Sequence, residues 1–250
     1  MIAGFLNEFD KIMWRFKYRA IPFLCGILCA LYGVLGANTG LGDALSLPSA
    51  LTNLSLSNFM FVALPPLCSI FLPLVIFMLA ADLYTHELEN KSIKCCVMRP
   101  VSRLSVYLSK FLAITCYTAL LLGVAFVVTG VFQVISDGSA SAIGGALGVY
   151  AVSLLPLLGF IATAAFISVL VPNPSMSMFL SIIVYVAMLA ASLIWSQAGS
   201  AFFTSYLGWY KMWMGSGVPI GHIVTTIALI TSYSALVFMF GYFVFDKKDI

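Results

Sequence analysis

Residues 82–110 read DLYTHELENKSIKCCVMRPVSRLSVYLSK and separate two strongly apolar runs, at 59–81 and 111–135. The chain has 12 basic and 9 acidic side chains, and this segment carries a large share of them: Asp82, Glu87, Glu89, Lys91, Lys94, Arg99, Arg103 and Lys110. An apolar run of about 20 residues is long enough to cross a bilayer as a helix. The pattern therefore predicts two membrane spans joined by a charged connector.

The composition of the whole chain also indicates a protein that lies in a lipid bilayer. Its 250 residues are 62% hydrophobic and only 8% charged, and the mean hydropathy is +1.08. A soluble domain carries about 25% charged residues, and it could not hide this much apolar surface in a single core. The net charge of +3 is small and spread over segments that flank apolar runs. A nucleic-acid surface is therefore not expected.

Six apolar runs are long enough to span a membrane, at 20–37, 59–81, 111–135, 145–171, 175–195 and 223–245. None of them contains an ionised side chain. Continuous runs of this length indicate helices, because strands of a membrane barrel would alternate apolar and polar residues. We therefore expect an all-α polytopic membrane protein in which residues 1–250 form a single transmembrane domain. Prolines within or beside the runs predict kinks or broken ends, namely Pro22, Pro65, Pro66, Pro73 and Pro156.

The distribution of Lys and Arg predicts the orientation. With the N-terminus inside, 11 of the 12 basic residues face the cytosol, and Lys211 alone faces outward. This asymmetry places both termini in the cytosol. Cys95 and Cys96 then lie on the cytosolic side, where disulfides are not expected. Cys25 and Cys29 share a helix face, but no His or acid accompanies them, so we expect no metal site.

Residues 1–19 predict an amphipathic helix that lies along the inner leaflet. Its apolar face comprises Ile2, Phe5, Leu6, Phe9, Ile12, Met13 and Phe16, and its polar face comprises Asn7, Glu8, Asp10, Lys11, Arg15 and Lys17. The pattern fits a membrane anchor alone, and it fits equally an anchor that also touches a cytosolic partner.

The loop between the fifth and sixth runs is aromatic and nearly uncharged. Residues 201–222 read AFFTSYLGWYKMWMGSGVPIGH. This stretch is too polar and too rich in glycine to span a bilayer, and Trp209, Tyr210 and Trp213 suit the headgroup region. We expect one or two short re-entrant or interfacial helices on the outer side.

The motifs of ATP hydrolysis and of metal proteases do not occur in this sequence. No Gly-x-x-x-x-Gly-Lys-Ser/Thr loop is found, and His86-Glu87 is followed at position 90 by Asn90 instead of the second His of a zinc protease. No catalytic residue is therefore assigned. The runs carry no charge at mid-span, which argues against an ion-coupled pump. We expect the energy for any transport to enter from a partner.

The charged segment itself predicts a helix over residues 83–97. The acids Glu87 and Glu89 precede Lys91 and Lys94, as the helix dipole favours, and Arg99-Pro100 ends the helix. Ser102 can then cap the helix of the third run. Charge alone fits a solvated loop that follows the positive-inside pattern as well as it fits a docking element.

Several stretches together resemble ABC-2 type transporter permeases. Those proteins show Glu-x-x-x-Gly-Thr after the second helix, then Pro-x-Ser-Arg, then a Lys that opens the next helix. The matching residues here are Glu87 to Ser92, with Lys91-Ser92 in place of Gly-Thr, Arg99-Pro100-Val101-Ser102-Arg103, and Lys110-Phe111. The start, Asn7-Glu8-Phe9-Asp10-Lys11, resembles the family's Glu-x-x-Lys interfacial helix. Phe166 to Leu170 resembles its junction between the fourth and fifth helices, and Phe245 to Ile250 its end.

The resemblance implies a six-helix subunit in a bacterial cytoplasmic membrane. It implies a second permease subunit, identical or homologous, and separate ABC ATPase subunits that hold ATP and Mg. The coupling residues would be Glu87, Glu89, Lys91, Lys94, Arg99, Pro100, Ser102 and Arg103. The outer gate would involve Phe202, Phe203, Tyr206, Trp209, Tyr210 and Trp213.

The function expected from this resemblance is ATP-driven export, with no enzymatic activity and no cofactor on the chain itself. An apolar interior favours an amphiphilic or apolar cargo, such as a peptide antibiotic, a lipid or a drug, as in bacteriocin immunity. An intramembrane enzyme acting on lipid or peptide is the alternative, and it needs converging polar residues at mid-span, which the runs lack. A passive channel is weakened by the lack of a polar helix face.

Overall fold

The computed structural model describes residues 2–37, 60, 63–89, 102–137, 143–194, 204, 206–209 and 220–248. These residues are almost entirely helical, and no strand occurs among them. Five helices in the described ranges are long and apolar enough to cross a membrane, at 64–89, 103–135, 143–170, 174–192 and 223–247. The chain therefore has the all-α architecture of a multi-pass membrane protein, as the sequence predicted.

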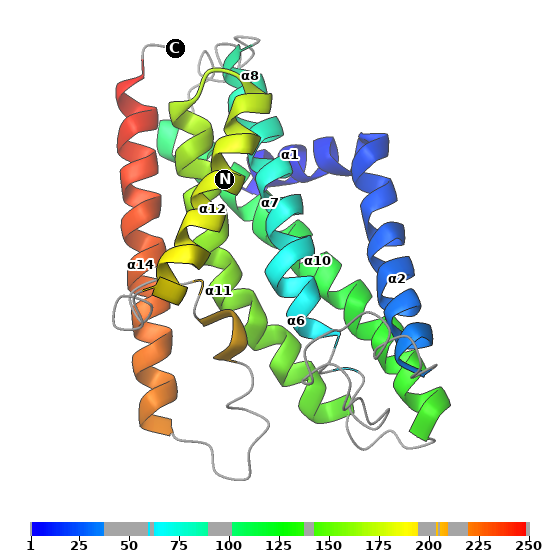
Figure 1. Cartoon of the computed structure of the whole chain (residues 1–250). Helices are drawn as coiled ribbons and strands as arrows, with labels where there is room; N and C mark the ends of the chain where they lie inside the picture. Colours follow the sequence, from blue (N-terminus) through cyan, green and yellow to red (C-terminus); the bar gives the residue numbers. More distant parts are fainter. Residues whose placement is uncertain are drawn as a thin grey trace.

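The first two helices form a corner. α1 (Ile2–Trp14) lies across one end of the helix bundle, and α2 (Phe16–Ala37) runs from it along the bundle (Figure 1). Only Arg15 separates them. The predicted first run at 20–37 is thus helical, although α2 is not one of the five helices that meet the spanning criteria.

The second run forms one continuous but irregular helix. It comprises α6 (Leu64–Pro66), the π-helical η2 (Leu67–Phe71), α7 (Leu72–Ala80), the π-helical η3 (Ala81–Thr85) and α8 (His86–Glu89). Pro73 has no N–H to donate to the preceding turn. The hydroxyl of Tyr185 donates a hydrogen bond to the carbonyl of Ser69 in that turn. The predicted irregularity around the prolines is therefore present, and the helix extends eight residues beyond the predicted end at 81.

The third run belongs to the longest helix, α10 (Arg103–Asp137). Its 35 residues measure about 52 Å, more than the ~30 Å hydrocarbon core of a bilayer. The N–H of Ser105 donates to Oγ of Ser102 at 3.3 Å, which confirms the predicted cap. The helix begins eight residues before the apolar run, and this first part includes Lys110, which is paired inside the molecule as described below.

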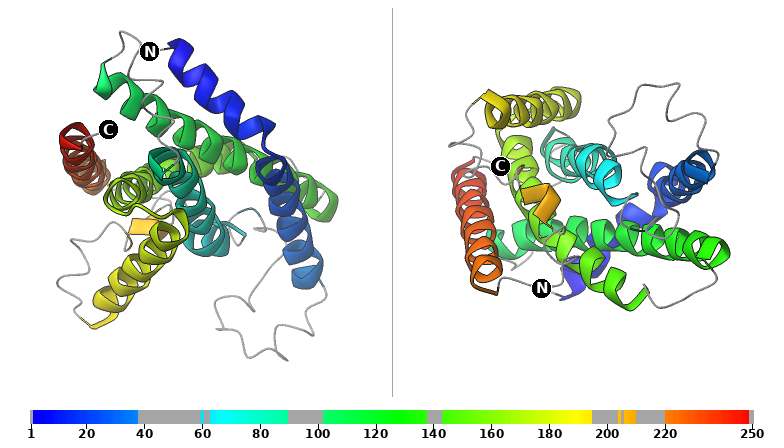
Figure 2. Two further views of the ribbon diagram at one scale, coloured as in Figure 1. Left: turned by 90° about the horizontal axis from the view of Figure 1, so that it is seen from above. Right: turned by 60° about the horizontal axis from the view of Figure 1, so that its bottom comes forward.

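The remaining helices are α11 (Ile143–Leu170), α12 (Pro174–Ile194) and α14 (Ile220–Lys247). α11 packs against α14, α10, α7 and α12 and forms the centre of the bundle, as both views in Figure 2 show. Peripheral helices turn large apolar side chains outward, including Phe23 of α2, Phe179 of α12 and Phe240 of α14. Such surfaces suit contact with lipid.

Candidate functional site

Three helices meet at four charged side chains that we call the ionic cluster: Glu8 and Lys11 of α1, Glu87 of α8 and Lys110 of α10. Nζ of Lys110 lies 2.5 Å from Oε2 of Glu87 and 3.2 Å from Oε2 of Glu8. Nζ of Lys11 lies 2.8 Å from Oε1 of Glu8 and 3.2 Å from Oε1 of Glu87. Each carboxylate therefore bridges both ammonium groups, and the four charges sum to zero.

Lys110 is the most deeply buried member, with a side chain that is 1% exposed. An ammonium group has three donors. Lys110 directs them at Glu8, at Glu87 and at the backbone carbonyl of Leu83, 2.9 Å away in η3. A buried charge is tolerated when it is paired and hydrogen-bonded in this way, and removing one partner typically costs about 3–5 kcal/mol.

Lys11 forms the exposed edge of the ionic cluster, with a side chain that is 36% exposed. Desolvation lowers the pKa of Lys11, but the carboxylates of Glu8 and Glu87 outweigh it and raise the pKa above the usual 10.5. Lys11 therefore keeps its charge throughout the physiological range.

A second group of charges, which we call the Asp82 cluster, fastens the corner between α1 and α2 to η3. Asp82 accepts hydrogen bonds from Nη1 of Arg15 at 3.1 Å and from the hydroxyl of Tyr18 at 2.6 Å. Lys17 also forms an ion pair with this carboxylate. Two cations thus share one anion, so this group carries an excess of positive charge.

The structure places the predicted coupling residues in different environments. Glu87 is buried in the ionic cluster, whereas the side chain of Glu89 is 48% exposed, with Oε2 3.9 Å from Nδ1 of His86. Ser102 is the exposed cap of α10, and Arg103 donates to the backbone carbonyls of Asp246 and Lys248. Glu87 is thus placed to orient this end of the helix, and Glu89 is accessible from outside. Lys91, Lys94, Arg99 and Pro100 lie outside the described residues.

Two of the predicted gate residues are described. Tyr206 is partly buried and Trp209 is 3% exposed, in a short 3₁₀ turn at 206–209. The ring of Trp209 is therefore packed inside the chain. The place of this stretch in the headgroup region stays a prediction. Phe202, Phe203, Tyr210 and Trp213 lie outside the described residues.

Sequence reasoning assigned Glu8 to the polar face of the first helix, and the structure corrects this. Glu8 is 6% exposed and faces α10. Its position carried a signal, since Glu8 stands three residues after Phe5 and four before Ile12, within the apolar stripe. The burial of Lys110 had no such local signal, because it depends on carboxylates from two distant segments.

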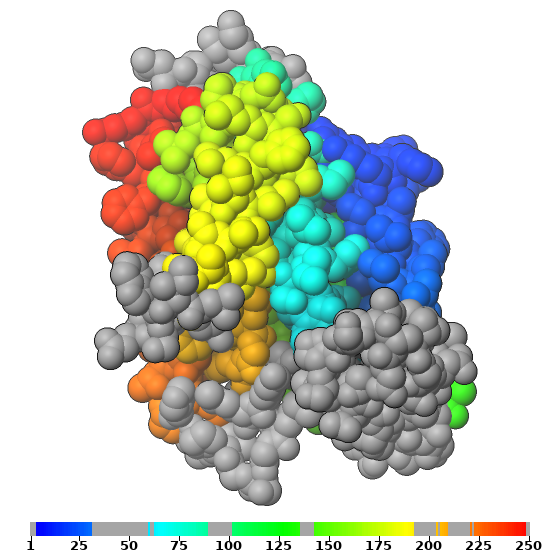
Figure 3. Space-filling view, in the orientation of Figure 1, coloured from blue at the N-terminus to red at the C-terminus, as the bar shows by residue number. Residues whose placement is uncertain are grey.

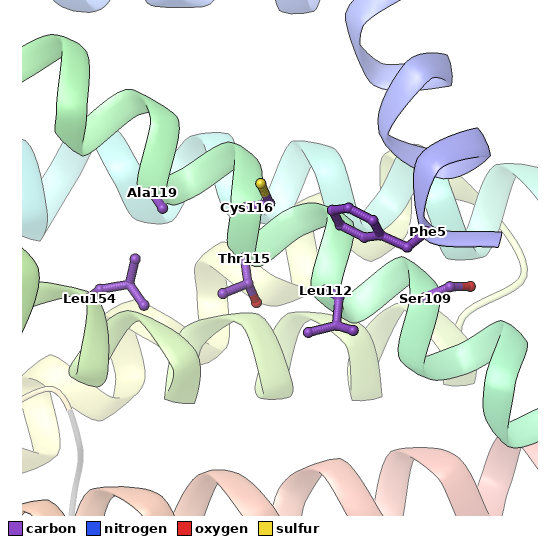
Figure 4. Close-up of a pocket in the computed structure, with 7 residues that line it drawn as sticks. All are labelled: Phe5, Ser109, Leu112, Thr115, Cys116, Ala119 and Leu154. Carbon is purple, nitrogen blue, oxygen red and sulfur yellow. The ribbon is translucent and has the colours of Figure 1, made fainter. Parts of the chain in front are cut away.

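An apolar hollow of about 370 Å³ lies beside α10 and is open to the surface. Figure 4 shows Phe5 of α1 on one side and Thr115 and Cys116 of α10 among its walls, with Leu154 of α11 opposite. The hydroxyl of Thr115 donates to the carbonyl of Phe111 at 2.9 Å. The hydroxyl of Ser109 also donates to a backbone carbonyl, and Cys116 is an exposed free thiol among otherwise apolar walls. The hollow therefore suits an apolar chain.

The described residues contain no group of three His, Cys, Asp or Glu side chains that could hold a metal ion. The ionic cluster is closed upon itself, and all three donors of its buried ammonium group are used. Such an arrangement joins α1, α8 and α10, and Lys110 keeps no donor for a further ligand.

One comparison with known proteins identifies a family. Residues 43–250 match the family described as Protein of unknown function (DUF2705), so the chain belongs to that family. No curated protein matches the chain.

Proposed function

We propose that this member of the DUF2705 family is the permease subunit of an ATP-driven ABC exporter of the ABC-2 type. The observation that carries the proposal is the convergence of Glu8, Lys11, Glu87 and Lys110. Three separate stretches that resemble ABC-2 permeases supply these residues, and the three stretches meet in one ionic cluster. Such a meeting is what we expect if the three stretches belong to one functional element.

The proposed topology has six spans, with α2 as the first, in a bacterial cytoplasmic membrane. The strong Lys and Arg asymmetry supports a cytosolic location for both termini and for residues 82–110. The ionic cluster then lies at the cytosolic ends of the spans, where α1 lies across the bundle.

The proposed mechanism assigns the ionic cluster the role of a joint. ATPase subunits that bind and hydrolyse ATP with Mg dock against the segment that begins at Glu89. Their movement reaches α8, and the ion pairs of Glu87 and Lys110 pass it to α1 and α10. α12 has no charged residue and makes no ion pair with these helices in the described structure. α12 instead contacts the second helical run by packing and by the hydrogen bond from Tyr185 to Ser69. In the proposed cycle, α1, α8 and α10 move as one body and shift relative to α12.

The proposed cargo is amphiphilic or apolar, such as a peptide antibiotic, a lipid or a drug, and it passes between this chain and a second permease subunit. The apolar character of the helices supports this class, because they provide no charge at mid-span to accompany an ion.

The experiment that tests the proposal reverses the exposed charge. In the complex purified from native membranes, Glu89→Lys should lower both ATPase co-purification and ATP turnover several-fold. Asp246→Lys reverses an exposed acid at the end of α14 and serves as the matched control, with both quantities unchanged. Equal values for the two variants would remove the docking role of Glu89. Substrate turnover by the chain without any ATPase would instead support an intramembrane enzyme.

A further inference from the structure

An apolar groove of about 270 Å³ separates α2 from the second helical run and opens to the surface. Cys25, Leu28 and Cys29 line it from α2, and Ile70 and Leu74 line it from η2 and α7. Figure 3 shows α2 (blue) and α7 (cyan) on the same face of the molecule. Leu28 and Ile70 are 45% and 62% exposed, so the groove can be reached from the surrounding lipid.

Beyond this groove, toward the α1 end, the same two helical runs carry the Asp82 cluster, which we call the rim: Tyr18 stands seven residues before Cys25, and Asp82 stands eight residues after Leu74. Lys17 and Arg15 both pair with Asp82, which leaves one positive charge in excess. The side chain of Lys17 is 43% exposed, whereas that of Asp82 is 16% exposed. The accessible part of the rim is therefore cationic. Arg19, the next cation along α2, donates to the carbonyl of Met13 at 2.9 Å and lies over the ring of Trp14.

The spacing of the rim and the groove fits a lipid. Lys17 and Leu28 lie on one face of α2, and the 11 residues between them rise about 16 Å. A cation at the headgroup region thus stands above a groove in the hydrocarbon region. Trp14 and Phe16 at the same corner are 78% and 85% exposed, which is the placement that interfacial aromatic residues adopt.

We infer that the groove and its rim hold one phospholipid with an anionic headgroup. Its acyl chain lies between α2 and α7, and its headgroup is bound by Lys17 and Arg15. This lipid site requires only that α2 and α7 lie in a membrane. It therefore does not depend on the proposed transport function. The second copy of the chain is the competing occupant, and the excess positive charge at the rim favours the lipid.

A tryptophan placed in the groove tests this site. The full-length Leu28→Trp variant is reconstituted in phosphatidylcholine bilayers that contain a small, equal mole fraction of brominated phosphatidylglycerol or brominated phosphatidylcholine. Quenching is measured relative to the parent protein. One lysine near the membrane surface corresponds to roughly fivefold enrichment of an anionic lipid. Brominated phosphatidylglycerol should therefore quench about fivefold more effectively.

Lys17→Gln in the Leu28→Trp background should reduce this preference to nearly none. Asp82 keeps Arg15 and Tyr18 as partners in that variant, so the fold is retained. Two controls set the reference: Lys247→Gln should leave the preference intact, and Leu236→Trp on the exposed face of α14 should show no preference. An equal effect of both lipids on Leu28→Trp would overturn the inference, as would a preference that survives Lys17→Gln. If neither brominated lipid quenches the fluorescence of the Leu28→Trp variant, the groove is occupied by a second protein chain and the inference is wrong.

Discussion

One turn of α10 makes two joints of opposite chemistry. Lys110 faces α1 and α8 and forms the ionic cluster, whereas Tyr107, three residues earlier, faces α14 and packs among the rings of Phe238, Tyr242 and Phe245. The first joint is directional and depends on charge. The second depends on how closely the side chains pack. The buried Tyr107 hydroxyl has no hydrogen-bond partner among the described atoms, and it occupies the space that a side chain at position 241 would need.

The difference teaches what each joint can do. A buried ion pair holds two helices together by a directed attraction, and it therefore suits a connection that passes movement from one helix to the next. A close-packed contact permits little change of shape. Charge substitutions should therefore act on the first joint and volume substitutions on the second.

Lys110→Met should give the largest effect, because it leaves Glu8 and Glu87 buried with Lys11 as their remaining cation in the ionic cluster. We expect a loss of about 3–5 kcal/mol in the free energy of unfolding, seen as a lower unfolding temperature in detergent. Lys247→Met, at the exposed end of α14, is the control and should have little effect. Equal unfolding temperatures for the two variants would show that the ionic cluster does not hold the helices together.

Gly241→Ala should be next, since the added methyl group would overlap the hydroxyl of Tyr107. Overpacking of this kind typically costs about 1–3 kcal/mol. Tyr107→Phe removes the hydroxyl and should restore most of the loss in the double variant. A Gly148→Ala control has open space around it and should not destabilise. Failure of Tyr107→Phe to rescue would mean that packing at this joint is not the constraint.

Arg103→Gln should have a smaller effect, about 1 kcal/mol, because the guanidinium group satisfies carbonyls at the C-terminal end of α14 and is partly exposed. Hydrogen exchange should increase in the last turn of α14 while the rest of that helix stays protected. Uniformly faster exchange would contradict this local role.

Alkaline pH should give the smallest effect, by weakening the contribution of Lys11 to the first joint. The pKa of Lys11 is raised in the folded chain, so its contribution is fully present below the unfolded value of 10.5 and is lost as pH rises through the folded value. The difference in unfolding temperature between the parent and Lys11→Met should therefore stay constant from pH 7 to pH 10 and shrink above it. A difference that shrinks below pH 10 would place Lys11 outside the ionic cluster.

The sequence predicted the helices well and the charged joint poorly, for physical reasons. An apolar run marks a helix that lies in lipid or in the interior of the bundle, so the helices at 143–170 and 174–194 begin and end within two residues of their predicted bounds. Polar residues at the helix ends do not appear in such runs. α10 therefore begins eight residues before the run at 111–135, and the second helix continues to Glu89.

The partners of the charged residues could not be predicted from local pattern. Glu8 and Lys110 are 102 residues apart, and only the fold brings them together. The cap at Ser102 was predictable because its partner is three residues away. The six-span topology and the role of the segment after Glu89 stay predictions.

The most direct test of the joint follows two distances through the ATP cycle. In the complex with its ATPase, spin labels are placed at Asp10→Cys of α1 and Leu104→Cys of α10, both exposed, and then at Asp10→Cys and Met176→Cys of α12, with other accessible cysteines replaced by Ser. If α1 and α10 move as one body, the first distance stays constant when ATP binds and the second changes. A change in the first distance would contradict the account.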